Sequence, residues 1–272
     1  MSRDRGEDAR SSEYREFRPP ASLADYIFCF WTQAIRSRTE FAQRVLPDCC
    51  VDLMLVNDVP TVAGPWTEPF LAKLAPGTNI LGARCHPGLA SGLLGMPASE
   101  LLNRSAPLSD VWGCARADAF ARIAEKRTLV ARMSAMESAL LSLVANAPPI
   151  DKPVTGAIEW IARRPDGQVE ELSRWLGFSS RQIQRRFTKA VGYGPKLFQS
   201  VLRFQRLLSF GGKANARGNL AQFAADACYA DQSHMTREVQ RFSGKSPGEL
   251  LSTSRSTLAL SGLIQPPGDS EG

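Results

Sequence analysis

Two segments in the C-terminal half of the chain repeat one layout at a spacing of 52 residues. Each segment, at residues 169–195 and 220–247, has a short apolar helical pattern, a turn, and a second helical pattern that carries Arg and Gln or His. The matched positions pair apolar residues, glycines and prolines: Ile183 with Met235, Phe187 with Val239, Gly192 with Gly244, and Pro195 with Pro247. Such an internal repeat rarely arises by chance. The pattern therefore predicts two helix-turn-helix units.

The first helix of the first copy has one apolar stripe. Leu172, Trp175 and Leu176 recur at i, i+3 and i+4, so we expect them to be buried together. Gly177 follows and supplies a residue that accepts a positive φ at the end of the helix. Ser179 can then cap the next helix, because its hydroxyl accepts from a free amide of the first turn.

The second helix of this copy has a polar face opposite its apolar one. Its expected buried positions recur every fourth residue, at Ile183, Phe187 and Val191. The opposite face carries Arg181, Gln184, Arg185 and Thr188. Arg can bridge O6 and N7 of guanine, and Gln can bridge N6 and N7 of adenine, so this face suits a major groove. The alternative is that Arg and Gln are simply good helix formers on a solvated face.

The second copy repeats this face with other residues. Asp231 is the expected cap, and Met235, Val239 and Phe242 are the expected core. Between the copies, a Pro-initiated apolar pattern over residues 195–210 predicts one connecting helix. The exposed face of the second copy carries Gln232, Ser233, His234, Arg237 and Arg241.

The two copies, the connecting GYGPK and RFQR motifs, and the run YADQSHMTREVQRFSGKSP together resemble the DNA-binding domain of the AraC/XylS family of bacterial transcription regulators. The resemblance covers residues 151–251. It implies that the first helix of each unit is a scaffold and that the second enters a major groove, with the two units on successive grooves of one DNA face. Carried over by motif position, the base-reading residues are Arg181, Gln184, Arg185, Gln232, Ser233, His234 and Arg237.

One position departs from the family pattern. The family has Gly after the scaffold helix of the second unit, where this chain has Cys228. That turn must therefore avoid a positive φ or carry some strain.

The positive charge of the chain lies in this C-terminal region. Residues 151–251 hold 16 Lys and Arg against 9 Asp and Glu, a net charge of +7 within a total of +6. Phosphate binding requires such an excess. Arg186 and Arg206 could equally form ion pairs within the domain. The predicted phosphate contacts are Arg186, Lys189, Arg203, Arg206, Arg241 and Lys245.

The N-terminal half predicts short strands separated by turn residues. Residues 1–18 are charged and poor in large aliphatics, so we expect a disordered arm. Strand patterns follow at residues 27–33, 44–56, 59–64 and 78–84, which predicts a small sheet or partly closed barrel. The fold class is therefore α+β, with a β-rich effector or dimerisation domain at residues 19–147 before an all-α domain at 154–251.

The segments VLPDCCVDLML, AGP and LGARCHPG resemble a β-rich domain type that often precedes such DNA-binding domains. That type has Gly at the position of Cys49 and a large apolar residue at that of Cys85. Aromatic walls and a buried charge could form an effector pocket. Alternatively Trp31 and Trp66 are core residues, Asp48 belongs to a turn, and Asp52 pairs with Arg84. The candidate pocket residues are Trp31, Asp48, Asp52, Trp66, Arg84 and His86.

The end of the N-terminal half predicts helix. Residues 97–103 have helix-start chemistry, residues 108–113 read as a loop, and Asp118 can cap a long helix to about residue 146. That helix has a heptad pattern, which fits either a homodimer seam or packing on its own sheet. Its apolar positions are Leu129, Met133, Met136, Leu140 and Leu143. A Pro-rich linker at residues 148–153 follows, the first helix of the C-terminal domain is expected at residues 155–164, and residues 252–272 form a tail.

The six cysteines and two histidines lack the spacing of a metal site, and we expect no metal, cofactor or enzyme activity. No apolar run reaches the ~18 residues of a membrane span, and the N-terminus has no signal-peptide pattern, so we expect a cytoplasmic protein without membrane contacts. The expected partners are double-stranded DNA, a small-molecule effector, RNA polymerase for an activator, and a second copy. The competing hypothesis is a thiol-responsive or electrophile-responsive sensor or enzyme in the N-terminal half, using Cys49 and Cys50, with DNA binding as its output.

Overall fold

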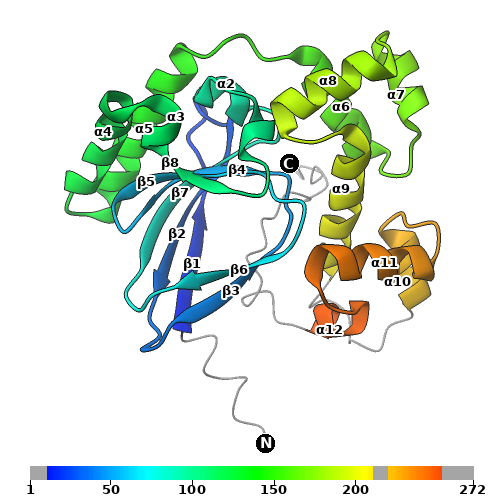
Figure 1. The fold of residues 1–272 in the computed structure, drawn as a ribbon, viewed down its shortest axis with the longest axis horizontal. Helices are drawn as coiled ribbons and strands as arrows, with labels where there is room; N and C mark the ends of the chain where they lie inside the picture. Colours follow the sequence, from blue (N-terminus) through cyan, green and yellow to red (C-terminus); the bar gives the residue numbers. More distant parts are fainter. Residues whose placement is uncertain (1–10, 211–219, 253–272) are drawn as a thin grey trace, which may run out of the picture.

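A computed structural model describes residues 11–210 and 220–252, which form a β-rich N-terminal region and a helical C-terminal region (Figure 1). The predicted α+β class is confirmed. The strands are β1 (Ser12–Phe17), β2 (Ile27–Ile35), β3 (Phe41–Val45), β4 (Val51–Val56), β5 (Val59–Ala63), β6 (Phe70–Leu74), β7 (Asn79–Cys85) and β8 (Ser105–Pro107).

The strands form one six-stranded antiparallel sheet and a separate two-stranded antiparallel sheet. The six-stranded sheet has the order β1-β2-β7-β4-β5-β8, and β3 pairs with β6. Burial alternates along β4: Leu53 and Leu55 are buried on one face, while Asp52 and Met54 lie on the other. Helices pack on the first face, and the β3–β6 pair lies over the second (Figure 1).

The N-terminal helices are α2 (Ala90–Leu94), α3 (Leu108–Trp112), α4 (Cys114–Ala121) and α5 (Leu129–Ala145), with 3-10 turns η1 (Ala98–Leu101) and η2 (Arg122–Glu125). Met136 and Leu140 of α5 are fully buried in the core of their own sheet, and Leu129 is 43% exposed. The heptad positions thus serve packing within the domain. Homodimer formation through α5 stays a prediction.

Three expectations for this half are wrong. The predicted arm contains β1, because Tyr14 and Phe17 of this polar segment pair with β2 and rest on the sheet. The predicted long helix is divided into α4, η2 and α5, and Thr128 rather than Asp118 caps α5. The predicted loop at residues 108–113 holds α3. The first ten residues of the arm lie outside the described part of the chain.

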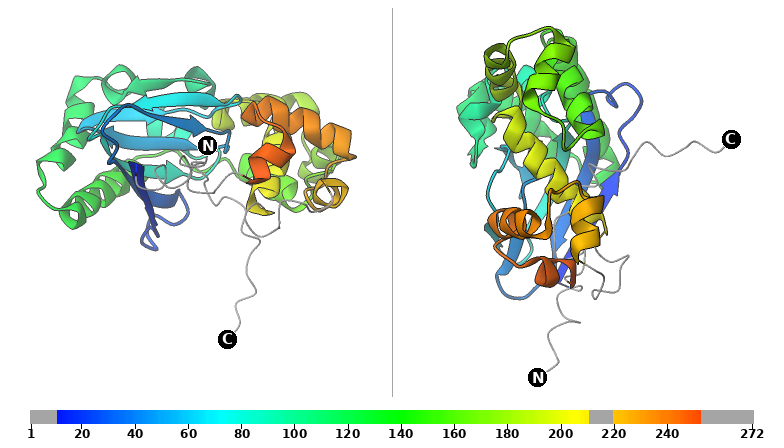
Figure 2. Two further views of the ribbon diagram at one scale, coloured as in Figure 1. Left: turned by 90° about the horizontal axis from the view of Figure 1, so that it is seen from below. Right: turned by 90° about the vertical axis from the view of Figure 1, so that its right-hand side faces the viewer.

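The C-terminal region consists of seven described helices. They are α6 (Lys152–Arg163), α7 (Val169–Leu176), α8 (Ser180–Val191), α9 (Pro195–Phe210), α10 (Leu220–Asp226), α11 (Gln232–Ser243) and α12 (Pro247–Ser252). Helix α6 begins three residues before the predicted position, with Asp151 as its cap. The long α9 joins the two units, as predicted, with α6 to α8 at one end and α10 to α12 at the other (Figures 1 and 2). Residues 253–272 of the predicted tail lie outside the described residues.

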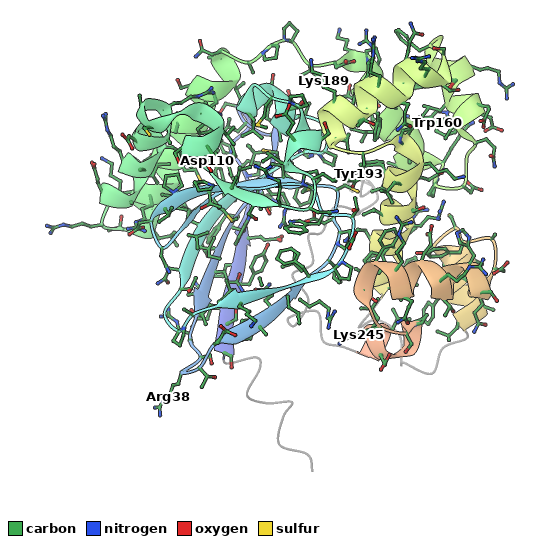
Figure 3. The ribbon with its side chains drawn as sticks, in the orientation of Figure 1. Arg38, Asp110, Trp160, Lys189, Tyr193 and Lys245 are labelled. Atoms are coloured by element: carbon green, nitrogen blue, oxygen red, sulfur yellow. The ribbon has the colours of Figure 1, made fainter. Side chains whose placement is uncertain are left out.

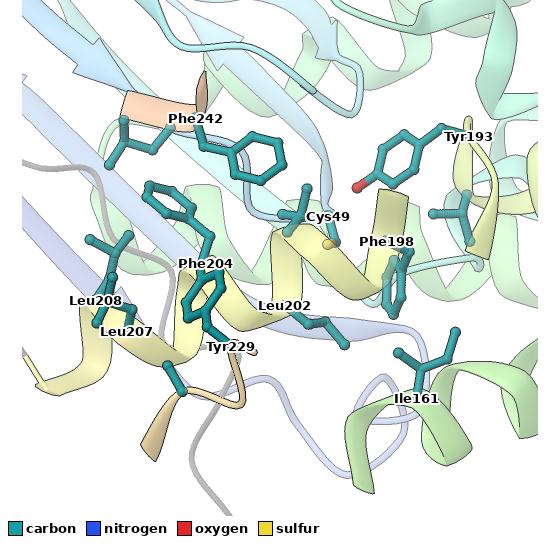
Figure 4. Close-up of a cluster of buried hydrophobic side chains, with 14 of the residues drawn as sticks. Cys49, Ile161, Tyr193, Phe198, Leu202, Phe204, Leu207, Leu208, Tyr229 and Phe242 are labelled. Carbon is teal, nitrogen blue, oxygen red and sulfur yellow. The ribbon is translucent and has the colours of Figure 1, made fainter. Parts of the chain in front are cut away.

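The hydrophobic core of the C-terminal region includes two residues from the N-terminal half. Leu46 and Cys49, from the loop between β3 and β4, belong to the same buried cluster as Phe198, Phe204 and Phe242. Figure 4 shows Cys49 beside α9 within this cluster. The two regions are therefore packed together rather than joined only by the chain.

Candidate nucleic-acid interface

Helix α8 is fixed at both ends by its own sequence. At its start, the Ser179 hydroxyl accepts from the Gln182 amide at 3.3 Å, and the Gln182 side chain accepts from the Ser179 amide at 3.0 Å. This reciprocal capping box satisfies two amides that the first turn leaves unpaired. At its end, Gly192 adopts φ 103°, which closes the helix without a Cβ clash. Ile183 and Phe187 are buried as predicted, so the opposite face is left outward.

Three predicted base-reading residues of α8 are exposed. Arg181, Gln184 and Arg185 lie on the outward face, and Gln184 Nε2 donates to Thr188 Oγ1 at 3.2 Å. This face carries donors for guanine and a bidentate amide for adenine. These side chains lie on the side of α8 opposite its buried residues.

Helix α11 repeats the arrangement. Asp231 Oδ1 accepts from the His234 amide at 2.7 Å, and Gly244 ends the helix at φ 67°. Gln232, Ser233 and Arg237 are exposed on the outward face. The two recognition faces therefore contain the polar groups that direct base contacts require.

His234 differs from its neighbours, because its ring is turned partly inward. Its Nε2 lies 3.5 Å from Glu238 Oε1, and its ring meets the edge of Tyr229 at a centroid distance of 5.4 Å. The side chain is 30% exposed. Its assignment as a base reader remains a prediction, and in this arrangement the ring also packs within the unit.

The prediction of Arg203 as a phosphate contact is wrong. Arg203 is 8% exposed; its guanidinium donates to the Pro165 carbonyl at 2.9 Å and pairs with Glu238 at 3.2 Å. A cation that is held inside the domain by a carboxylate and a carbonyl does not reach a phosphate. Its contacts fix α11 on α9 instead.

Two other predicted phosphate contacts have partners inside the domain. Arg186 Nη1 lies 2.9 Å from Asp151 Oδ2, which is the ion pair considered as the alternative. Arg206 Nη1 instead donates to Cys228 Sγ at 3.2 Å. Lys189 and Arg241 are exposed, and Lys245 is half-buried. Figure 3 shows Lys189 on α8 and Lys245 just beyond α11, at the two ends of the C-terminal region.

Two cysteines occupy positions where the resembling families have glycine. Cys228 has φ 62° and Cys49 has φ 67°, so both cysteines adopt the left-handed backbone conformation that glycine favours. The sequence allowed two alternatives for the Cys228 turn, a backbone without a positive φ or a strained one. The structure has the positive φ, and therefore the strained turn. A further correction concerns Trp175, which is 59% exposed, because only Leu172 of the predicted stripe is fully buried.

Four of the six candidate pocket residues form one polar cluster. Arg84 pairs with Asp52 at 3.0 Å and with Asp48 at 3.6 Å, and Trp31 Nε1 donates to Asp52 Oδ1 at 3.2 Å. The Asp52–Arg84 pair considered as an alternative is therefore present. The cluster bridges β2, β4 and β7 on the face that the β3–β6 pair covers.

The other two candidates lie elsewhere. Trp66 stacks on Phe70 at a centroid distance of 3.8 Å. His86 Nε2 forms a hydrogen bond with the Ala24 carbonyl at 3.1 Å, and burial lowers the pKa of its imidazole. The six residues are thus not gathered around one cavity.

A cleft of about 740 Å³, which no sequence pattern predicts, lies between α8 and the N-terminal region. Its walls include Leu89 and Met96 on one side, Arg185 and Lys189 on the other, and the prolines of the linker. The residues of the two walls are about 90 positions apart in the chain, and local sequence patterns do not predict contacts at that separation. Among the described residues, no three His, Cys, Asp or Glu side chains are grouped to hold a metal ion, and no helix has the length and apolarity of a membrane span.

Two family models match the chain. Residues 15–107 match a domain of unknown function (DUF6597), and residues 172–253 match a helix-turn-helix domain. No curated protein matches the chain. The second match covers α8 to α12 and most of α7, and so spans both recognition helices.

Three solved structures show a distant similarity of fold. An apo ToxT variant from Vibrio cholerae has 10% identity and a TM-score of 0.43, with 89% of this chain and 97% of that chain covered. ToxT bound to an unsaturated fatty acid has 9% identity and a TM-score of 0.37, with 80% and 92% covered. The AraC-like transcriptional activator CuxR has 16% identity and a TM-score of 0.21, with 74% and 81% covered. At these TM-scores the similarities carry no argument about this chain.

Proposed function

We propose that the C-terminal domain, which matches a helix-turn-helix domain model, is the DNA-binding domain of an AraC-type transcription regulator and reads a specific DNA sequence with α8 and α11 in two successive major grooves. The base contacts are made by Arg181, Gln184 and Arg185 of α8, and by Gln232, Ser233, His234 and Arg237 of α11. Lys189, Arg241 and Lys245 hold phosphates.

The observation that carries this proposal is the pair of capped, outward recognition faces at opposite ends of one helix (Figure 1). The connecting α9 has 16 residues, so it spans about 24 Å at 1.5 Å per residue. Adding about 5 Å, half the width of a helix, at each end brings the distance between the flanking helix axes to the order of one DNA turn, ~34 Å. The two faces also differ in side chains, which favours an asymmetric target over nonspecific binding.

The N-terminal region regulates this binding, either through a small-molecule effector or through dimerisation. Support comes from its contact with α8: the N-terminal half supplies one wall of the cleft that Arg185 and Lys189 line. A ligand or a second copy that changes how the N-terminal region packs would change the surroundings of these DNA-binding residues.

The thiol-sensor alternative has little support from the structure. Burial raises the pKa of the Cys29 thiol to about 12, and burial also raises the pKa of Cys49, Cys50 and Cys85. These thiols are therefore protonated and shielded near neutral pH, whereas reaction needs an accessible thiolate. Labelling of the folded protein with a thiol reagent should modify the exposed Cys114 and leave these four slow; rapid labelling of Cys49 or Cys50 would revive the alternative.

The test is a selection of genomic DNA fragments with the purified full chain, followed by footprinting at two salt concentrations. We expect one asymmetric site with two protected clusters one helical turn apart, and binding that weakens steeply with salt. The comparison is the Arg185→Ala/Arg237→Ala variant, which should keep the fold because both side chains are exposed, and which should lose enrichment. Equal recovery of all fragments by the unaltered protein would contradict sequence-specific reading.

A further inference from the structure

The end of β3 and the loop that leads to β4 run along α9 and contact both helix-turn-helix units. At the end of β3, Arg44 Nη1 donates to the carbonyl of Ser243 at 3.0 Å. Ser243 is the last residue of α11, where carbonyls lack partners within the helix. A guanidinium at this end also complements the negative end of the helix dipole. A residue of the N-terminal region therefore holds the end of the second recognition helix.

The middle of the same loop is attached to α9. The Pro47 carbonyl accepts a hydrogen bond from the side chain of Gln205, which is 4% exposed on α9. Leu46 is 1% exposed and belongs to the hydrophobic core of the C-terminal domain. The loop is thus built into that core and is not laid on its surface.

The far end of the loop reaches the end of α8. The Cys49 thiol lies against the Tyr193 hydroxyl, and Figure 4 shows the two groups pointing toward each other. Tyr193 directly follows Gly192, the residue that ends α8. Pro65 also packs here, so closely that a Cβ on Gly192 would lie 2.6 Å from its ring. The N-terminal region therefore fixes the end of the first recognition helix as well.

One ion pair anchors this loop to the sheet. Asp48 Oδ2 lies 3.6 Å from Arg84 of β7, and Asp48 Oδ1 accepts from the Cys50 amide at 3.0 Å. Arg84 is itself held by Asp52. Since Arg84 and Asp48 are almost buried, the pair resists solvent screening and can hold the loop in one position.

We propose that residues 44–49 form a brace that sets the position of α8 relative to α11, and that the Asp48–Arg84 pair anchors this brace to the sheet. The inference rests on the proposed function, because it assigns the N-terminal region a means of controlling where the two recognition helices meet DNA. Arg44, Gln205 and Cys49 are positioning residues in this arrangement and touch no DNA. A change in the sheet that moves Asp48 reaches both recognition helices through one loop.

The first test needs no DNA. Hydrogen exchange of the full chain is compared for the unaltered protein, Asp48→Asn and Arg44→Ala. We expect Asp48→Asn to speed exchange about tenfold at both ends of the brace, in residues 192–198 and 240–245, because local opening becomes easier at both contacts. Arg44→Ala should act only at residues 240–245. Faster exchange confined to the neighbourhood of residue 48 would overturn the brace.

The second test measures helix positioning with the DNA site from the selection. Inserting one base pair between its two contact clusters shifts them by about 3.4 Å and about a tenth of a turn. We expect the insertion to weaken binding of the unaltered protein at least about tenfold, and that of Arg44→Ala less than about threefold. Arg36→Ala is the matched control, since Arg36 also lies in the N-terminal region, its side chain is 58% exposed, and it pairs with Glu13. An Arg44→Ala variant as sensitive to the insertion as Arg36→Ala would overturn the positioning role.

The two proposals fail in different ways. If no DNA site is selected, the proposed function fails while hydrogen exchange still decides whether the brace links the two units. If a site is selected and all variants respond equally to the insertion, sequence-specific reading stands and the brace is refuted.

Discussion

The two helix-turn-helix units share one layout and are held in place by different means. In the first unit, Gly177 forms the turn at φ 70°, and the end of α8 packs against Pro65 of the N-terminal region. In the second unit, Cys228 forms the turn at φ 62°. There α11 is tied to α9 by the buried Arg203–Glu238 pair.

This difference shows that a repeated sequence pattern does not imply a repeated set of supports. Both units contact the N-terminal region, the first through Pro65 and the second through Arg44. The first unit has a glycine turn and only a half-exposed ion pair, between Arg186 and Asp151. The second has a buried ion pair within its own domain and tolerates a strained turn. Substitutions at matched positions should therefore have unequal effects.

The largest effect is expected from Arg203→Ala. It removes one partner of a buried pair and leaves the Glu238 carboxylate, whose side chain is 14% exposed, without its main cation. The free energy of unfolding should fall by about 3 to 5 kcal/mol, as for other broken buried pairs. Urea unfolding of the full chain measures this, and Arg186→Ala is the control, since its pair with Asp151 is 41% and 36% exposed. A loss no larger than that of the control would show that Arg203 does not support the second unit.

The next effect concerns base reading, which should be comparable in the two units. Arg185→Ala and Arg237→Ala should each cost about 1 to 3 kcal/mol of binding free energy at one cognate base and relax sequence preference there. Competition binding against sites with single base changes measures the loss. If either variant weakened binding to all sequences equally, that Arg would be a phosphate contact instead.

The two turns should respond in opposite directions. Cys228→Gly should stabilise the protein by about 1 kcal/mol, because glycine adopts the left-handed conformation without the Cβ penalty. Gly177→Ala should destabilise it by a similar amount, since Gly177 has φ 70° and no atom within 4 Å for a new methyl to contact. Thermal unfolding of both variants checks the pair of signs. Destabilisation by Cys228→Gly would mean that the contact between Arg206 and the thiol outweighs the backbone strain.

The smallest expected effect is that of Lys189→Ala. This exposed lysine should hold one phosphate, so its loss should weaken binding to all sequences alike. The slope of log K against log salt should become shallower by about 0.9. Binding at several salt concentrations measures the slope. An unchanged slope would show that Lys189 contacts no phosphate and that it only lines the adjoining cleft.

Local patterns in the sequence determined much of the C-terminal domain. Ser179 and Asp231 at the helix starts, glycines at the helix ends, and apolar residues every third or fourth position predicted α8 and α11 with their outward faces, because such signals act within one or two turns of helix. The β4 and β7 strands were predicted for the same reason, from short apolar runs between turn residues, but the run predicted at residues 44–56 contains a loop at residues 46–50 between β3 and β4. The prediction for Arg203 was wrong, because the helical pattern around an Arg is the same whether the Arg pairs with a carboxylate 35 residues away or lies in solvent.

Only the tertiary structure decided how the two regions meet. The Arg44 contact with Ser243 spans 199 residues, and that of Gln205 with Pro47 spans 158. Leu46 and Cys49 belong to the core of a domain that begins about a hundred residues later. Periodicity and capping report on neighbours along the chain, whereas these contacts depend on how two finished surfaces fit. The sequence by itself thus determined the recognition helices, and packing decided how they are held relative to one another.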